Sequence, residues 1–392
     1  MFADKIDPAR TEEKMSCILV KTFAEIFIQV KLRHCDCVFL KMSKETKRFC
    51  FKHPSGEDIY LFTLRNTNGT EVCISNYGAI ITSFKLLLKD HTFNDIVLGF
   101  DNMESYCSAA YLANYPYFGA VIGRYANRIK DASFRINGHV FHLAKNKGTD
   151  HIHGGLEGFD RKVWSCSYCS DEELVLTYTS KDGEEGYPGT LQTEIRFRLN
   201  DENELSYEIK ATSDKATAVN LTHHSYFNLN NGNGSIADHF ITIDSEAILE
   251  QDNNLVVTGR TTGVADTIYD FRKEKKIRQS WNALDGYDQS YVLDTTVNKT
   301  REDGLVFAAS AYSNLSRVRL EVYTSEPLVH FYTGKWIPSI TGKNQTAYHA
   351  FSGFCFETQK HPNAVNIAQF PNTILQPGET YYTKTMYRVL PG

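Results

Sequence analysis

The sequence of 392 residues lacks the features that mark several large protein classes. It has no long run of like charge, and its formal net charge of -5 does not indicate binding to nucleic acid or another polyanion. It has no glycine-rich phosphate loop, no alternation of strands with helices, no internal repeat and no linker rich in proline or serine. We therefore expect no nucleotide-binding fold, no nucleic-acid partner and no internal domain boundary.

Paired cysteines of the kind that hold zinc are also missing. The nine cysteines form an odd number without a repeating spacing. Cys35 with Cys37 and Cys166 with Cys169 are close pairs, but neither has a second pair at zinc-ribbon distance. Free thiols in a reducing compartment explain this usage best, so the sequence predicts a cytoplasmic protein.

The N-terminal region differs from the rest but holds no membrane-spanning run. Apolar residues at helical spacing predict an amphipathic helix over residues 17–32, and charged residues interrupt its apolar character. No small-residue cleavage site follows it. We expect residues 1–45 to be an extension, either disordered or the product of a mis-called start codon, and we expect no membrane partner.

Aromatic residues are plentiful, with 24 phenylalanines and 22 tyrosines. Aromatic side chains favour β-strands. They also suit a sugar-binding cleft, where a flat ring meets the apolar face of a sugar. The preference for strands alone would account for their number.

The dominant period of the sequence is two. Leu205, Tyr207 and Ile209 alternate with polar residues, and similar runs are separated by turn sequences. Such runs describe strands with one buried and one wet face. The sequence therefore predicts an all-β protein, a single large antiparallel β-sandwich over residues 46–392, with one short helix over residues 271–281.

An asparagine and an arginine follow an apolar strand in the segment 119–129. Asn127 supplies an amide and Arg128 a fork of N–H donors, and both suit sugar hydroxyls or a carboxylate. An arginine that closes a strand end for structural reasons would give the same pattern. The residues alone leave both interpretations open.

A second candidate is the loop around His153, which precedes Gly154 and Gly155. Two glycines let a backbone approach a ligand closely, although a single loop histidine is usually structural or exposed. The spacing His-x-His, together with the adjacent His223 and His224, also raises a metal site. Neither segment carries a carboxylate at a usual ligand spacing, so we predict no metal.

An acid and a base can be assembled from two further segments. His224 shares its predicted strand face with hydroxyl and amide side chains such as Tyr226, and an imidazole titrates near neutrality. Glu357 follows an apolar run and is expected to be partly desolvated. A salt bridge from Glu357 to Arg128 is the structural alternative. Asp288 can fix hydroxyl groups.

Together these segments resemble the aldose 1-epimerase (galactose mutarotase) family. The resemblance runs from about Asn76 to the C-terminus and rests on six motifs that occur in the family's order. They are Gly-Arg-x-Ala-Asn-Arg-Ile, His-Gly-Gly, Thr-x-His-x-Tyr-Phe-Asn-Leu, Gly-x-Asp, Tyr-Thr-x-x-Pro followed by Phe-Tyr-Thr-Gly, and Phe-x-Glu-Thr-Gln. The resemblance implies a β-sandwich of the galactose-mutarotase type with an open cleft on one sheet.

The resemblance also implies a function, the interconversion of the α and β anomers of free aldohexoses such as glucose and galactose, without a cofactor. By carry-over, Glu357 is the general base that takes the proton from the C1 hydroxyl, and His224 is the general acid that protonates the ring oxygen. The residues expected to bind substrate are Asn127, Arg128, His153, Tyr226, Asp288 and Glu326.

The chain departs from the family's pattern in several places. His223 stands where asparagine is usual, and Gln289-Ser290 stands where His-Asn is more usual. Glu326 replaces a common glutamine, and Lys335 replaces an expected asparagine. A second carboxylate in the cleft can change the preference for particular hydroxyls. The departures therefore bear on sugar preference more than on the reaction.

Other functions on the same scaffold remain open at this point. A hexose-6-phosphate 1-epimerase would want a basic cluster at the cleft, and only Arg124, Arg128 and Lys335 are candidates. A sugar-binding module without activity would not need His224 and Glu357 together. Glycoside hydrolysis normally needs a pair of carboxylates. For the favoured reading we expect a small hexose as the partner and a monomer or homodimer.

Overall fold

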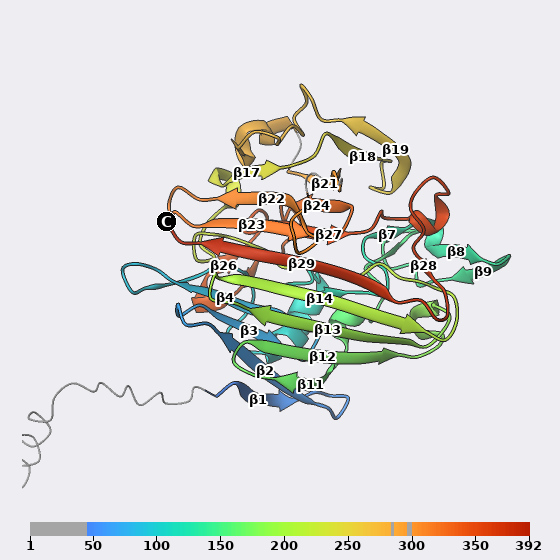
Figure 1. Cartoon of the computed structure of the whole chain (residues 1–392), viewed down its shortest axis with the longest axis horizontal. Coiled ribbons are helices and arrows are strands. Elements are labelled where there is room, and N and C mark those ends of the chain that lie inside the picture. Colours follow the sequence, from blue (N-terminus) through green and yellow to red (C-terminus); the bar gives the residue numbers. More distant parts are fainter. Residues whose placement is uncertain (1–44, 284–285, 296–299) are drawn as a thin grey trace, which may run out of the picture. The chain divides into compact units, whose positions relative to one another are not determined.

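The computed structural model describes residues 45–283, 286–295 and 300–392 (Figure 1). The expected helix over residues 17–32 and, apart from Glu45, the expected extension lie outside these residues. Strands dominate the described part, and its sheets pair their strands antiparallel. The prediction of an all-β, antiparallel protein is confirmed. Among the described residues, no helix is long and apolar enough to cross a membrane.

The largest element is a nine-stranded sheet, whose long strands cross the view in Figure 1. In spatial order it consists of β11 (Ser165–Cys169), β12 (Glu173–Ser180), β13 (Leu191–Leu199), β14 (Glu204–Ser213), β29 (Tyr381–Leu390), β23 (Arg319–Thr324), β22 (Val306–Tyr312), β17 (Phe240–Ile243) and β20 (Lys275–Lys276). In β14, Leu205, Tyr207 and Ile209 are buried while their neighbours are more exposed, as the period of two predicts.

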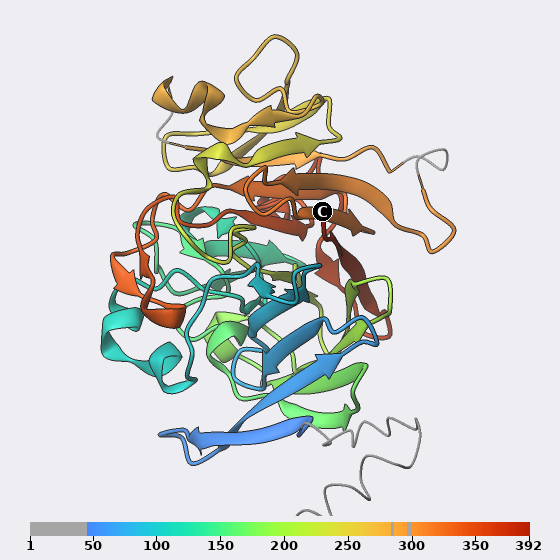
Figure 2. The same cartoon turned by 90° about the vertical axis from the view of Figure 1, so that its left-hand side faces the viewer.

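Two five-stranded sheets complete the main framework. One contains β1 (Lys47–Lys52), β2 (Asp58–Arg65), β3 (Glu71–Ser75), β4 (Ile81–Leu87) and β5 (Phe93–Asp95). The other contains β19 (Val257–Gly263), β18 (Ala247–Gln251), β21 (Asp288–Val292), β24 (Leu328–Tyr332) and β27 (Cys355–Gln359) in spatial order. Figure 2 shows the blue N-terminal strands lying beside the green strands of the nine-stranded sheet.

The hydrophobic core joins all three sheets. Its largest cluster of buried residues includes Phe62 of the N-terminal sheet, Ile195 and Leu320 of the nine-stranded sheet, and Phe331 and Phe356 of the second five-stranded sheet. Because β27 buries Phe356 in this cluster, the alternate residues of the strand face the other way. That opposite face carries Glu357.

Short elements connect the sheets. The remaining strands are β6 (Val121–Ile122) with β16 (Thr222–His223), β7 (Arg128–Ile129) with β10 (His151–Ile152), β8 (Ser133–Ile136) with β9 (His139–His142), β15 (Thr217–Ala218) with β28 (Ile374–Leu375), and β25 (Ile340–Thr341) with β26 (Ala347–Tyr348). Helical turns are α2 (Ala109–Ala113), η1 (Glu104–Cys107), η2 (Lys130–Ala132), η3 (Phe159–Arg161), η4 (Glu184–Gly186), η5 (Ile236–Asp238), η6 (Ile277–Ala283), η8 (Lys343–Gln345) and η9 (Ala364–Asn366).

The helix expected over residues 271–281 is not formed as such. Lys275 and Lys276 instead pair with Ile241 and Phe240 at the edge of the nine-stranded sheet. A short 3₁₀ helix, η6, begins only at Ile277. The backbone of this charged segment thus satisfies its hydrogen bonds through a sheet edge, which the sequence period did not reveal.

Candidate active site

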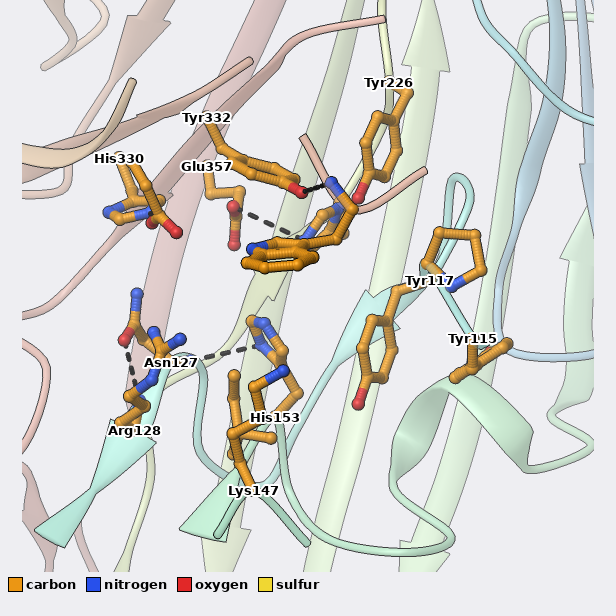
Figure 3. Close-up of a pocket in the computed structure, with 15 residues that line it drawn as sticks. Tyr115, Tyr117, Asn127, Arg128, Lys147, His153, Tyr226, His330, Tyr332 and Glu357 are labelled. Atoms are coloured by element: carbon orange, nitrogen blue, oxygen red, sulfur yellow. Dashed lines mark hydrogen bonds and ion pairs between the residues drawn. The ribbon is translucent and has the colours of Figure 1, made fainter. Parts of the chain in front are cut away.

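A pocket on the second five-stranded sheet gathers most of the residues expected from the sequence (Figure 3). Fifteen residues line it: Tyr115, Pro116, Tyr117, Asn127, Arg128, Lys147, Ile152, His153, His224, Tyr226, Asp288, His330, Tyr332, Trp336 and Glu357. They come from β7, β10, β21, β24, β27 and the loops between elements. Segments far apart in the sequence therefore meet in one place, as a site assembled by the fold requires.

The sheet itself explains why several of these side chains share one face. In the antiparallel register of β21, β24 and β27, Ser290 lies opposite His330, and His330 lies opposite Glu357. Asp288 lies opposite Tyr332 in the next row on that face. Directly opposite residues project from the same side of an antiparallel sheet. The floor of the pocket thus follows from strand register.

His224 and Glu357 are the central pair of the pocket. Nε2 of His224 lies 3.5 Å from Oε1 of Glu357, and both side chains are buried. Oε2 of Glu357 is also buried and has no hydrogen-bond partner in the protein. Burial lowers the pKa of His224, although the negative charge of Glu357 acts in the opposite direction. The pair therefore places a proton donor and a proton acceptor in one buried contact.

Aromatic rings fix the orientation of the His224 imidazole. The ring of Tyr226 stacks on it with centroids 5.0 Å apart, and the ring of Tyr117 lies 5.9 Å away at a similar tilt. His153 meets it edge-on at 5.3 Å. Nδ1 of His224 lies 3.5 Å from the sulfur of the buried Cys355. With Nδ1 turned to this thiol, Nε2 is the nitrogen directed at the carboxylate.

Asn127, Arg128 and His153 form the opposite wall. The backbone N–H of Asn127 donates to Nδ1 of His153 at 3.3 Å, and Oδ1 of Asn127 accepts the backbone N–H of Arg128 at 2.8 Å. Nε of Arg128 is buried without a partner in the protein. Burial lowers the pKa of His153 well below its usual range, and the positive charges of its neighbours add to this effect. A neutral imidazole and an arginine side chain thus line this side of the pocket.

The glycines after His153 allow close packing of the backbone rather than contact with a ligand. A Cβ on Gly154 would lie 1.8 Å from the carbonyl oxygen of Gly123, and one on Gly155 would lie 2.1 Å from a carboxylate oxygen of Glu185. Both glycines also have positive φ angles. From the sequence we expected the two glycines to let the backbone approach a ligand. The structure shows instead that they let two loops pack closely, and this packing holds His153 in place.

Asp288 reaches the pocket and is paired with a residue that the sequence analysis missed. Nε2 of His330 lies 2.8 Å from Oδ1 of Asp288, and Nδ1 of His330 lies 2.8 Å from Oγ of Ser290. His330 interrupts the apolar run of β24, Leu-Val-His-Phe-Tyr. A polar residue inside an apolar strand is the same signal that singled out Glu357, so the sequence did contain a pointer to His330.

Glu326 is the one expected site residue that the structure does not bring to this pocket. Its side chain is buried elsewhere, and Nζ of Lys360 lies 3.3 Å from Oε2. Glu326 lies just after the end of β23. A sequence motif at a strand end does not show whether a side chain there lines a cleft or is buried elsewhere. The departure from the usual glutamine therefore concerns a buried ion pair rather than sugar hydroxyls.

The structure also separates the two adjacent histidines and the two nearby arginines. His223 points away from the pocket, where burial lowers its pKa to about 3 and Ser225 lies 3.1 Å from its Nδ1. Arg124 is buried and donates to Ser180 and to the carbonyl oxygens of Lys181 and Pro188. His224 and Arg128, rather than these neighbours, face the cavity.

One set of residues in the pocket has the geometry of a metal site. One ligand atom each from His153, His224 and Glu357 lies within 4.8 Å of the others. Two imidazoles and one carboxylate are a donor set that zinc accepts. The three residues are therefore able to hold such an ion, and the expected absence of a metal stays a prediction.

Comparisons with known proteins agree with this geometry. The family model described as aldose 1-epimerase matches residues 60–388. The chain is 39% identical over 321 residues to the galactose mutarotase of Homo sapiens, which covers 81% of this chain and 90% of that protein. It is 32% identical over 345 residues to the aldose 1-epimerase of Escherichia coli strain K12, which covers 86% of this chain and 97% of that protein.

A solved structure gives the same answer at the level of the fold. Galactose 1-epimerase from Lactobacillus acidophilus matches with a TM-score of 0.75 and 27% identity, over 88% of this chain and 99% of that one. The sandwich type expected from the sequence is thereby confirmed. From the family model, the sequence identities and the fold, we conclude that the chain belongs to the aldose 1-epimerase family.

Proposed function

We propose that this chain interconverts the α and β anomers of free aldohexoses by general acid–base catalysis, with Glu357 as the base and His224 as the acid. The observation that carries the proposal is the 3.5 Å approach of His224 Nε2 to Glu357 Oε1 inside a pocket of hydroxyl-binding side chains. Anomer interconversion needs one proton removed from the C1 hydroxyl oxygen and one supplied to the ring oxygen, and both oxygens are bonded to C1. A pair at this distance is suited to both transfers.

In the first step the sugar ring opens. Glu357 takes the proton of the C1 hydroxyl while the C1–O5 bond breaks and C1 becomes an aldehyde carbon. O5 receives a proton from Nε2 of His224. Because burial lowers the pKa of His224, the imidazolium is a stronger acid than an exposed histidine would be. After the step Glu357 is protonated and His224 is neutral.

In the second step the two groups exchange roles. Rotation about the C1–C2 bond presents the other face of the aldehyde to O5. His224 takes back the proton from the O5 hydroxyl as O5 attacks C1, and Glu357 returns its proton to O1. The enzyme ends in its starting protonation state, and no oxidant, reductant or nucleophile is consumed.

The remaining walls of the pocket would hold the sugar. Arg128 offers a buried N–H without a partner, and Asp288 keeps one carboxylate oxygen beyond its contact with His330. We assign these two residues, with His153, Asn127 and Tyr226, to the binding of sugar hydroxyls. Positioning of this kind lowers the activation free energy because the reacting atoms are already held in the orientation that the reaction needs.

One observation keeps a second candidate, a hexose-6-phosphate 1-epimerase, in view. Lys147 lines the pocket together with Arg128, so two cations are available to an anionic substrate. Arg124 was another cation that the sequence analysis considered. Its guanidinium donates hydrogen bonds to Ser180 and to backbone carbonyl oxygens instead. The smaller basic cluster favours a free sugar over a sugar phosphate.

Compartment and assembly are part of the proposal. The six cysteines for which the structure gives a state are all free, which supports a reducing cytoplasm. We propose a monomer or a homodimer, with the site residues of one chain forming one pocket.

Polarimetry on freshly dissolved α-D-glucose and α-D-galactose tests the proposal. The purified protein is expected to speed the approach to the equilibrium rotation for at least one of these sugars. The same assay with hexose 6-phosphates separates the two candidates. Acceleration of only the phosphates would favour the second, and acceleration of neither would point to a sugar-binding protein without activity.

A further inference from the structure

His330 occupies the centre of a row of side chains that crosses three strands. Ser290 on β21 and Glu357 on β27 lie directly opposite it on either side. Such neighbours in an antiparallel sheet have Cβ atoms about 5 Å apart on the same face. The imidazole is therefore held between a serine hydroxyl and the proposed base.

Both ring nitrogens of His330 are already engaged. Nδ1 lies 2.8 Å from Oγ of Ser290, and Nε2 lies 2.8 Å from Oδ1 of Asp288. The residue lines the pocket but is only 3% exposed. With no ring nitrogen left for a sugar hydroxyl, His330 acts on its neighbours rather than on the substrate.

The surroundings of His330 favour its charged form. Burial opposes the charge, but the hydrogen bond to Asp288 and its negative charge outweigh this and raise the pKa of His330. For Asp288 burial also opposes ionisation, and the same contacts with His330 lower its pKa. An imidazolium donates from both nitrogens, which fits a carboxylate at one and a hydroxyl oxygen at the other.

Charged and titratable groups face His330 from every side of the pocket. They are Asp288 on β21, Glu357 on β27, Arg128 on β7, His153 after β10 and His224 after β16. The two carboxylates favour the positive charge, whereas Arg128 opposes it, as His153 and His224 do only when they are protonated.

We infer that His330 is a positioning residue of the reaction: held by Ser290 on one side, it fixes the direction of the Asp288 carboxylate so that Asp288 accepts from sugar hydroxyls. The inference rests on the proposed function. It extends the site by a Ser290–His330–Asp288 chain of hydrogen bonds that leaves only Oδ2 of Asp288 for the sugar. Asp288 therefore recognises the substrate through one oxygen in a fixed direction.

Two substitutions separate the hydrogen bond of His330 from its charge. His330→Gln keeps an N–H donor for Asp288 but removes the charge, so its KM is expected to stay near the wild-type value. His330→Leu also removes the donor, and its KM is expected to rise about tenfold further.

Ser290→Ala is the matched variant on the other ring nitrogen. It removes the hydroxyl that accepts from Nδ1, so its KM is expected to rise, by less than in His330→Leu. Circular dichroism checks that each variant is folded. If the folded His330→Leu variant keeps the wild-type KM, the inference is overturned and His330 is a packing residue.

Titration by NMR tests the inference without any measurement of turnover. The imidazole signals of His330, identified by their loss in His330→Gln, should titrate above the ordinary histidine range in the wild-type protein. In Asp288→Asn the midpoint should fall. A midpoint that is the same in both proteins would overturn the inference even if the protein is an active mutarotase. Failure of the wild-type protein in polarimetry, with the predicted titration intact, would instead count against the proposed function.

Discussion

Nε2 of His224 and Oε1 of Glu357 lie 3.5 Å apart, with both side chains buried in the same pocket. The separation has a simple chemical meaning. The proton that leaves during anomer interconversion comes from O1, and the proton that is added goes to O5. Both oxygens are bonded to C1, so an acid and a base that serve them must be close neighbours. This relationship links strand β27 and the segment after β16 to one reaction centre.

The first prediction concerns this pair. Glu357→Gln and His224→Asn each keep a side chain of similar size but remove the proton transfer, so each should lower kcat about 10²- to 10⁴-fold. Sugar binding should persist, because the other walls of the pocket are unchanged. Polarimetry measures kcat, and isothermal titration calorimetry measures binding. Turnover within about threefold of the wild-type value would remove that residue from its proposed role.

Much of this candidate site could be predicted because each of its proposed residues stands out within its own segment. Glu357 interrupts an apolar strand, and His224 and Arg128 belong to motifs of fixed spacing. His330 carries the same local signal as Glu357, but its meaning depends on the residue opposite it. Strand register is set by the whole sheet, so a single segment could not show that His330 meets Asp288 and Ser290.

The misplaced expectations have the same origin. Glu326 follows a motif at a strand end, and only the tertiary fold shows that Lys360 meets it away from the pocket. The segment 271–281 is charged and compatible with a helix, but the free edge of β17 offers its backbone a better set of partners. In both cases a contact with a residue far away in the sequence decides between two structures that the local sequence allows.

Glu326 supplies a second prediction and a control for the first. Glu326→Gln makes the same chemical change as Glu357→Gln, at a buried carboxylate outside the pocket. Its kcat and KM are expected to stay within about twofold of the wild-type values. Initial-rate polarimetry over a range of sugar concentrations measures both. A large rise in KM would return Glu326 to the substrate-binding residues.

The third prediction concerns Arg128, whose Nε is buried without a partner in the protein. Arg128→Ala should raise KM about 10- to 100-fold, because a charge-assisted hydrogen bond to the sugar is lost. Arg128→Lys keeps the charge but not the planar fork, so it should recover only part of the affinity. Steady-state kinetics compares the two variants. Full recovery by lysine would show that charge alone matters, and an unchanged KM in both would make the arginine structural.

A fourth prediction uses the donor set of His153, His224 and Glu357. Proton transfer by this mechanism needs no metal, so dialysis against a chelator should leave turnover unchanged. Added Zn²⁺ should inhibit, because an ion on His224 and Glu357 occupies the atoms that move protons. The inhibition should be competitive with sugar in polarimetric assays. Loss of activity after chelation, restored by a metal, would contradict the proposed role of the pair.

The last prediction concerns the stability of the fold and the buried His239. The backbone N–H of Leu229 donates to Nε2 of His239 at 3.0 Å, so that nitrogen must be unprotonated in the folded protein. Burial lowers the pKa of His239 from its ordinary 6.5 to about 4. Between these values the unfolded chain takes up a proton that the folded protein does not. The free energy of unfolding should therefore fall as the pH falls from about 6.5 to about 4.

The size of the effect follows from the same linkage. One such histidine contributes at most about 1.4 kcal/mol per pH unit within this window. Carboxylates add their own slope at low pH, so a difference between two proteins isolates the histidine. His239→Gln offers a carbonyl oxygen to the N–H of Leu229 and does not titrate, so its stability should depend less on pH. Urea unfolding at several pH values between 4 and 7 measures both curves. Parallel curves would show that His239 does not contribute the predicted pH dependence of the free energy of unfolding. Convergence of the two curves toward low pH would confirm that the neutral form of His239 is part of the folded state.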